Sequence, residues 1–120
     1  RKNAVRRALT KAYRERLAAV PGLSIPFAGG EDDSACHLFV VVLPEGADRD
    51  RVQGRMKERG IQTSIHYPPV HRFSSYRGRF PAEVPETERV ADRLVTLPLH
   101  PLMSVRDVDE GSDGLVASLG

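Results

Sequence analysis

The sequence predicts a single α+β domain with two layers, in which a small sheet of three to four strands is flanked by helices. The chain has 120 residues, of which 40% are hydrophobic and 28% charged, values typical of one globular domain. Segments with apolar residues at three-to-four spacing alternate with shorter segments rich in β-branched residues. Their order is helix, strand, helix, strand, helix, strand, helix, which is typical of a small sheet covered by helices.

Residues 1–20 are predicted to form an amphipathic helix, which Pro21 and Gly22 end. After a loop at 23–34, residues 37–43 form a continuous apolar run that predicts a strand covered on both faces. The apolar positions of the first helix are Val5, Leu9, Ala12, Tyr13, Leu17 and Val20.

A second helix is predicted over residues 48–59 because Asp48 is a good N-cap and Gly60 suits the left-handed position after a helix. Gly54 lies inside this helix at a cost of about 1 kcal/mol relative to alanine, so we expect it to mark close packing. Residues 61–67 alternate in polarity and predict a second strand.

The third part of the chain is predicted to be a surface loop followed by a helix and a strand. Residues 68–85 contain four prolines, which predicts an irregular loop. Pro85 opens a predicted helix at 86–93. Residues 95–99 then form a short strand, and Pro98 favours a position at an edge or end of the sheet.

A last helix is predicted to begin at Ser104, which has the capping-box spacing with Asp107. Residues 111–114, with the sequence GSDG, are poor helix formers, so we expect this helix to be weak or interrupted.

The charge distribution leaves two interpretations of the N-terminal segment. The formal net charge is +2, and basic residues are concentrated in the first helix. They form either a patch for nucleic acid or membrane, or the solvated face of an amphipathic helix. The second interpretation is favoured because no aromatic residues are interleaved with them, so neither nucleic acid nor a membrane is expected as a partner. The single Cys36 excludes an internal disulfide and suits a reducing cytosol, so a cytoplasmic location is expected.

The segment His66-Tyr67-Pro68-Pro69-Val70-His71 is the strongest candidate for a functional site. The two prolines restrict the backbone, so the imidazoles and the phenol are presented on a rigid loop. Binding groups are often found on such loops. The alternative interpretation is a structural proline turn with surface histidines.

Other site chemistries find little support. No metal site is predicted, because neither a cysteine pair nor a nearby carboxylate joins His66 and His71 in a known spacing. Ser64 lies two residues before His66, but this pair alone is a weak signal for nucleophilic catalysis. No catalytic residue is therefore assigned. The arginines 72, 77 and 79 either recognise an anion through their forked donors or form a solvated loop.

Five segments together resemble a known family: residues 37–41 (HLFVV), 48–52 (DRDRV), 56–71 (MKERGIQTSIHYPPVH), 88–101 (ERVADRLVTLPLHP) and 107–109 (DVD). In order and approximate spacing, the chain resembles the C-terminal small domain of the DegT/DnrJ/EryC1/StrS sugar aminotransferases. The resemblance implies the small domain of a fold-type I enzyme that depends on pyridoxal phosphate. Two features depart from the family pattern: Leu102 stands where glycine is common, and residues 111–114 break the apolar spacing.

The resemblance also implies a function. The parent enzyme would move an amino group from glutamate or glutamine to a nucleotide-linked keto sugar, acting as a homodimer. The cofactor lysine and most cofactor contacts would belong to an N-terminal large domain, and Lys57 is not assigned that role. His66, Tyr67 and His71 would border the sugar-nucleotide pocket, and Arg77 would help to bind its phosphates.

Three functions therefore remain under consideration. The first is a non-autonomous aminotransferase domain that is inactive alone, and the chain's start without methionine, in a helical pattern, favours it. The second is a free-standing α+β binding module. The third, nucleic-acid binding through the first helix, is the least supported. The first predicts an exposed interdomain surface, for which Val5, Leu9, Tyr13, Leu17 and the Pro68-Pro69 loop are the candidates.

Overall fold

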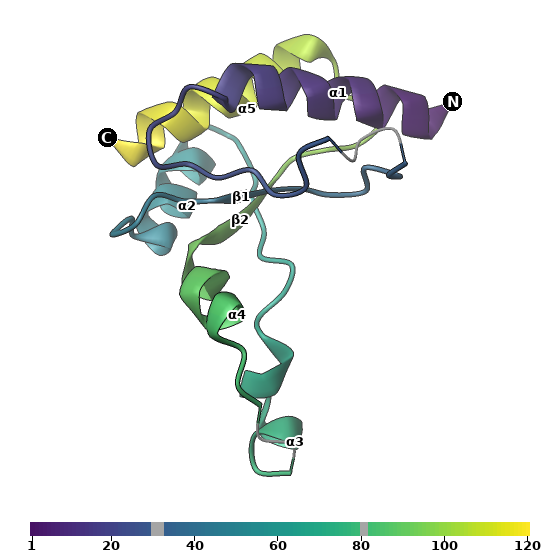
Figure 1. Cartoon of the computed structure of the whole chain (residues 1–120). Helices are drawn as coiled ribbons and strands as arrows, with labels where there is room; N and C mark the ends of the chain where they lie inside the picture. The colour runs from purple at the N-terminus through teal and green to yellow at the C-terminus, as the bar shows by residue number, and fades with distance from the viewer. Residues whose placement is uncertain (30–32, 80–81) are drawn as a thin grey trace.

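A computed structural model describes residues 1–29, 33–79 and 82–120 of the chain. Helices α1 (Lys2–Leu17) and α5 (Val105–Leu119) lie side by side over one face of an antiparallel sheet, which consists of β1 (Phe39–Val42) and β2 (Leu94–Leu97) (Figure 1). Helix α2 (Arg49–Glu58) packs against α5. The fold is therefore α+β, as predicted.

The sheet is smaller than predicted. In the described residues it has two strands rather than three to four, and one-residue bridges extend its edges, Ser24 with Val42 and Ser64 with Thr96. The predicted strand at 61–67 is wrong. Its first residue, Ile61, donates its N–H to the Met56 carbonyl at the end of α2, and the segment then leaves the sheet after Ser64.

The helices cover only one face of β1, so the prediction of a strand covered on both faces is met only in part. Phe39 and Val41 belong to the core, whereas on the other face Val40 is half-buried and Val42 is buried.

The apolar stripe of α1 forms the core of this domain, and its assignment to an exposed interdomain surface is wrong. Leu9, Tyr13 and Leu17 are 3%, 0% and 1% exposed because they pack onto the domain's own sheet. The ring of Tyr13 stacks on that of Phe39, with 4.6 Å between the centroids. Cys36 is buried as well.

Helix α5 is continuous through the residues expected to interrupt it. Gly111 and Gly114 lie where neighbouring side chains approach the helix most closely. A Cβ atom would stand 3.0 Å from the Tyr13 hydroxyl oxygen at Gly111 and 2.3 Å from Cδ1 of Ile61 at Gly114. Close packing therefore outweighs their low helix propensity. The predicted capping box of Ser104 and Asp107 is present.

The local signals of α2 are confirmed, with one exception. The Asp48 carboxylate accepts a hydrogen bond from the N–H of Arg51, and Gly60 has a φ of +79°. Gly54 does not mark close packing, because nothing lies within 4 Å of a Cβ atom built there.

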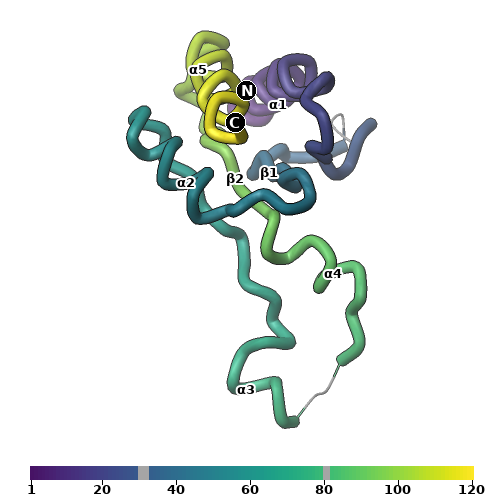
Figure 2. The backbone as a smooth tube through the Cα atoms, turned by 90° about the vertical axis from the view of Figure 1, so that its left-hand side faces the viewer, coloured from purple at the N-terminus to yellow at the C-terminus, as the bar shows by residue number. Residues whose placement is uncertain are grey.

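Residues 65–79 and 82–93 form an arm that leaves the sheet and returns to it as β2 (Figures 1 and 2). The arm carries η1 (Val70–Arg72), α3 (Ser74–Arg77), α4 (Pro85–Val90) and η2 (Ala91–Arg93). The predicted loop at 68–85 thus contains short helices, and the helix predicted at 86–93 is split into α4 and η2. Large apolar side chains are exposed along the arm: Tyr67, Val70, Phe73 and Tyr76. In the described residues, no helix has both the length and the apolar character needed to cross a bilayer.

Candidate functional site

His66 lies at the base of the arm, where the chain leaves the sheet. Two residues earlier, Ser64 exchanges both backbone hydrogen bonds with Thr96 of β2, at 2.8 and 3.1 Å. This pairing brings the His66 ring to β2, where its Nδ1 atom lies 3.0 Å from the Thr96 hydroxyl oxygen. The ring of Tyr67 meets that of His66 edge-on, with 5.0 Å between their centroids. The sheet thus fixes the first of the predicted site residues.

Two hollows meet at His66. The smaller, of about 180 Å³, also contacts His37, Gln62 and Ser64. The larger, of about 800 Å³, is lined by residues that include Phe27, Val40, Val42, Arg89, Val90 and Arg93. His66 is the predicted site residue that borders both, so of these residues it is the one placed beside space that could hold a ligand.

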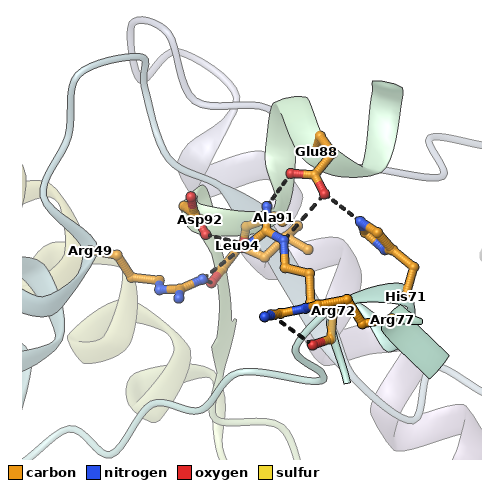
Figure 3. Close-up of polar contacts among 8 residues, drawn as sticks. All are labelled: Arg49, His71, Arg72, Arg77, Glu88, Ala91, Asp92 and Leu94. Atoms are coloured by element: carbon orange, nitrogen blue, oxygen red, sulfur yellow. Dashed lines mark hydrogen bonds and ion pairs between the residues drawn. The ribbon is translucent and has the colours of Figure 1, made fainter. Parts of the chain in front are cut away.

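His71 and Arg72 take part in an ion-pair cluster that we call the clasp: His71, Arg72, Glu88 and Asp92 (Figure 3). The Glu88 carboxylate contacts both the Nε2 atom of His71 and the guanidinium of Arg72. Arg72 also reaches Asp92 at 3.1 Å. Hydrogen bonds from Arg72 first and His71 second lower the pKa of Glu88 from 4.5 to about 2. The clasp therefore joins the outgoing and returning halves of the arm.

The arginines considered as an anion site are not gathered at His66. Arg72 is engaged in the clasp, and Arg77 in α3 donates a 3.1 Å hydrogen bond to the Arg72 carbonyl oxygen. Helix α3 lies at the far end of the arm, away from the sheet (Figure 1). Both Arg77 and Arg79 are exposed. An anion at Arg77 would be bound at the tip of the arm rather than at its base.

Sequence reasoning did not identify several residues beside His66. Thr96 lies in a predicted strand and has no role assigned from the sequence, although it is a polar residue between the apolar Val95 and Leu97. Phe27 is 88% exposed and has a φ of +63°, and Arg14 holds its carbonyl oxygen at 3.2 Å. No local sequence signal predicts this geometry for Phe27.

The residues present do not fit pyridoxal phosphate or a metal ion. A Schiff-base cofactor needs a lysine in a sheltered site beside groups that bind its ring and phosphate. Lys2, Lys11 and Lys57, the chain's three lysines, are all exposed. Lys57 borders a hollow of about 660 Å³ that contains neither a carboxylate nor an arginine. Across residues 1–29, 33–79 and 82–120, no three His, Cys, Asp or Glu side chains are placed to hold a metal ion.

Comparison with known proteins gives a consistent result. The model of the DegT/DnrJ/EryC1/StrS aminotransferase family matches residues 1–115. The fold is similar to that of DesV from S. venezuelae, solved in complex with a ketimine intermediate, with a TM-score of 0.84 and 32% identity over 97% of this chain. It is also similar to the aminotransferase TlmJ from Streptoalloteichus hindustanus, with a TM-score of 0.82 and 29% identity over 98% of the chain.

A third similar structure is that of DesI in the presence of its TDP-sugar product, with a TM-score of 0.83 and 29% identity over 97% of this chain. The chain spans only 31% of DesV, 32% of TlmJ and 31% of DesI. The similarity therefore concerns about a third of each of these enzymes.

Proposed function

We propose that the chain is the C-terminal small domain of a sugar aminotransferase, because it belongs to the DegT/DnrJ/EryC1/StrS aminotransferase family. The complete enzyme transfers an amino group from glutamate or glutamine to a nucleotide-linked keto sugar. Pyridoxal phosphate is bound mainly by an N-terminal large domain, and the enzyme is a cytoplasmic homodimer. The small domain supplies part of the substrate cleft and of the dimer interface.

One observation carries this proposal. The chain aligns over 97% of its length with DesV but covers only 31% of that enzyme. A domain of this kind is expected to contribute walls to a site rather than its reactive centre, and the exposed lysines of this chain agree with that role. The TDP-sugar product of DesI supports a nucleotide-linked sugar as the substrate class.

The chain's own residues are proposed to bind and orient the substrate. His66 offers its Nε2 atom to the hollows at the base of the arm, because Nδ1 is engaged by Thr96. Tyr67, whose side chain is 71% exposed, offers a phenol and an aromatic face next to it. His71 is proposed to contribute to the sugar-nucleotide pocket, while its contact with Glu88 holds this part of the arm in place. Arg77 binds a phosphate at the tip.

The deciding experiment is an absorbance spectrum after addition of pyridoxal phosphate, recorded for this chain and for the product of its complete reading frame. The longer protein is expected to show a cofactor band that glutamate bleaches, and this chain is expected to show none. A cofactor band in this chain by itself would contradict the assignment of the cofactor lysine to the large domain. A Lys57→Ala variant would then show whether Lys57 forms the band.

A free-standing binding module is the second candidate, and one observation favours it. Tyr13, Leu17 and Leu115 are buried to 0–1% exposure within the chain itself, so the domain completes its own core. The absence of a cofactor band in both the chain and its complete reading frame would support this alternative over the aminotransferase.

A further inference from the structure

Thr96 occupies a rigid position beside His66. It pairs with Val40 in the centre of β2, and its backbone N–H and C=O both bond to Ser64 on the other side. The residue is 6% exposed. A β-branched side chain has few accessible χ1 rotamers, so the hydroxyl is held in place by the sheet.

The hydrogen-bonding capacity of the Thr96 hydroxyl bears on which nitrogen of His66 carries the proton. A hydroxyl has one hydrogen to donate, and a buried donor without an acceptor is costly. Among the described residues, the Nδ1 atom of His66 is the hydrogen-bonding partner of this hydroxyl, at 3.0 Å. If Nδ1 carried the proton and donated it to the oxygen, the threonine hydrogen would be left without an acceptor. Donation from the hydroxyl to Nδ1 is the arrangement that satisfies both groups.

We propose that Thr96 is a positioning residue for His66, which fixes the imidazole as the tautomer with its proton on Nε2. The ring then presents a hydrogen-bond donor to the hollows at the base of the arm. It selects ligand atoms that accept hydrogen bonds, such as phosphate, keto or hydroxyl oxygens, over ammonium and amide donors. The identity of the ligand rests on the proposed function, since a nucleotide-linked keto sugar carries such oxygens.

The tautomer can be measured on this chain without any ligand. Nitrogen-15 NMR of histidine-labelled protein, recorded at about pH 9, well above the ordinary histidine pKa of about 6.5, separates protonated from unprotonated ring nitrogens. The expected result is an unprotonated Nδ1 and a protonated Nε2 at His66. The signals are assigned by their loss in His66→Gln. The reverse pattern would overturn the proposal.

Two variants of Thr96 test whether its hydroxyl is the cause. Thr96→Val removes the hydroxyl and is expected to shift the signals from those of a single tautomer toward the tautomer mixture of a histidine side chain in water. Thr96→Ser keeps the hydroxyl and is expected to restore the wild-type pattern. A wild-type pattern in Thr96→Val, with the amide spectrum of a folded protein, would show that the hydroxyl does not set the tautomer.

If Thr96→Val does not fold, the wild-type measurement still decides between the two tautomers. The outcome is also independent of catalysis. A complete enzyme that fails to bind a nucleotide sugar would overturn the proposed function and leave the tautomer result unchanged.

Discussion

The hydroxyl of Tyr13 donates a 2.7 Å hydrogen bond to the carbonyl oxygen of Pro98. This bond joins the C-terminal half of α1 to the residue that follows β2, and the ring of Tyr13 stacks on that of Phe39. Gly111 of α5 leaves room for the hydroxyl, since a Cβ there would be 3.0 Å from it. One side chain thus links both long helices to the sheet.

Tyr13→Phe is expected to destabilise the domain. The variant keeps the stacked ring but leaves the Pro98 carbonyl without its donor, at a cost of about 1–3 kcal/mol. Urea unfolding measures the change in the free energy of unfolding. An unchanged midpoint would mean that water replaces the donor at no cost.

Stability is expected to fall in alkali because of the same residue. Burial first, and the Asp107 charge second, raise the pKa of Tyr13 above its ordinary value. The folded state therefore favours the neutral phenol. This contribution is complete below about pH 10, where the unfolded chain titrates, and is lost as the pH rises toward the higher folded pKa. Thermal unfolding from about pH 9 to 11 should show a steeper decline for wild type than for Tyr13→Phe.

Gly111→Ala is expected to be less stable than Gly54→Ala. Both substitutions gain helix propensity, about 1 kcal/mol each. At Gly54 the new methyl group meets nothing within 4 Å, whereas at Gly111 it meets the fully buried Tyr13. The difference between the two free energies of unfolding should be about 1–3 kcal/mol, the usual cost of overpacking. Equal values would show that Tyr13 can move aside.

Glu88→Gln is expected to loosen the arm while leaving the core intact. The variant removes the charge that His71 and Arg72 share, so amide exchange should accelerate in η1 and α3 but not in α5. Glu86→Gln is the matched control, because Glu86 pairs only with Arg89 in its own helix among the described residues. Equal effects of the two variants would argue against the clasp.

The clasp should also weaken in acid. The pKa of Glu88 is lowered from 4.5 to about 2 in the folded state, so its contribution is present above about pH 4.5 and is lost as the pH falls through 2. Exchange in the arm of the wild type should approach that of Glu88→Gln over this interval. A difference in exchange rate between wild type and Glu88→Gln that stays constant over this interval would contradict the role of the Glu88 charge in the clasp.

In the product of the complete reading frame, His66→Ala and Arg77→Ala are expected to weaken binding of the nucleotide sugar. A hydrogen bond involving a charged group contributes about 1.5–3 kcal/mol, which corresponds to an affinity loss of about tenfold or more. Arg51→Ala is the control, because Arg51 is exposed on α2, outside the arm. Unchanged calorimetric affinity in His66→Ala and Arg77→Ala would remove these residues from the site.

Several elements were predictable because their signals are local. The Asp48 cap, the left-handed Gly60 and the capping box of Ser104 and Asp107 each involve residues within four positions of one another. The apolar stripe of α1 is evident in the sequence, but the surface that it packs against is not. Periodicity shows that a helix face is buried and does not show what covers it.

The sequence by itself determined the order of α1, β1, α2, β2 and α5 and the caps of α2 and α5, because these depend on short-range propensities and local hydrogen bonds. Only the tertiary structure decided that Gly111 belongs in a continuous helix, that residues 61–67 pair only at Ser64 and that Glu88 clasps the arm. It also placed Thr96 beside His66, thirty residues away in sequence. The reason is physical: close packing and hydrogen bonds between distant residues depend on positions that the folded chain alone creates.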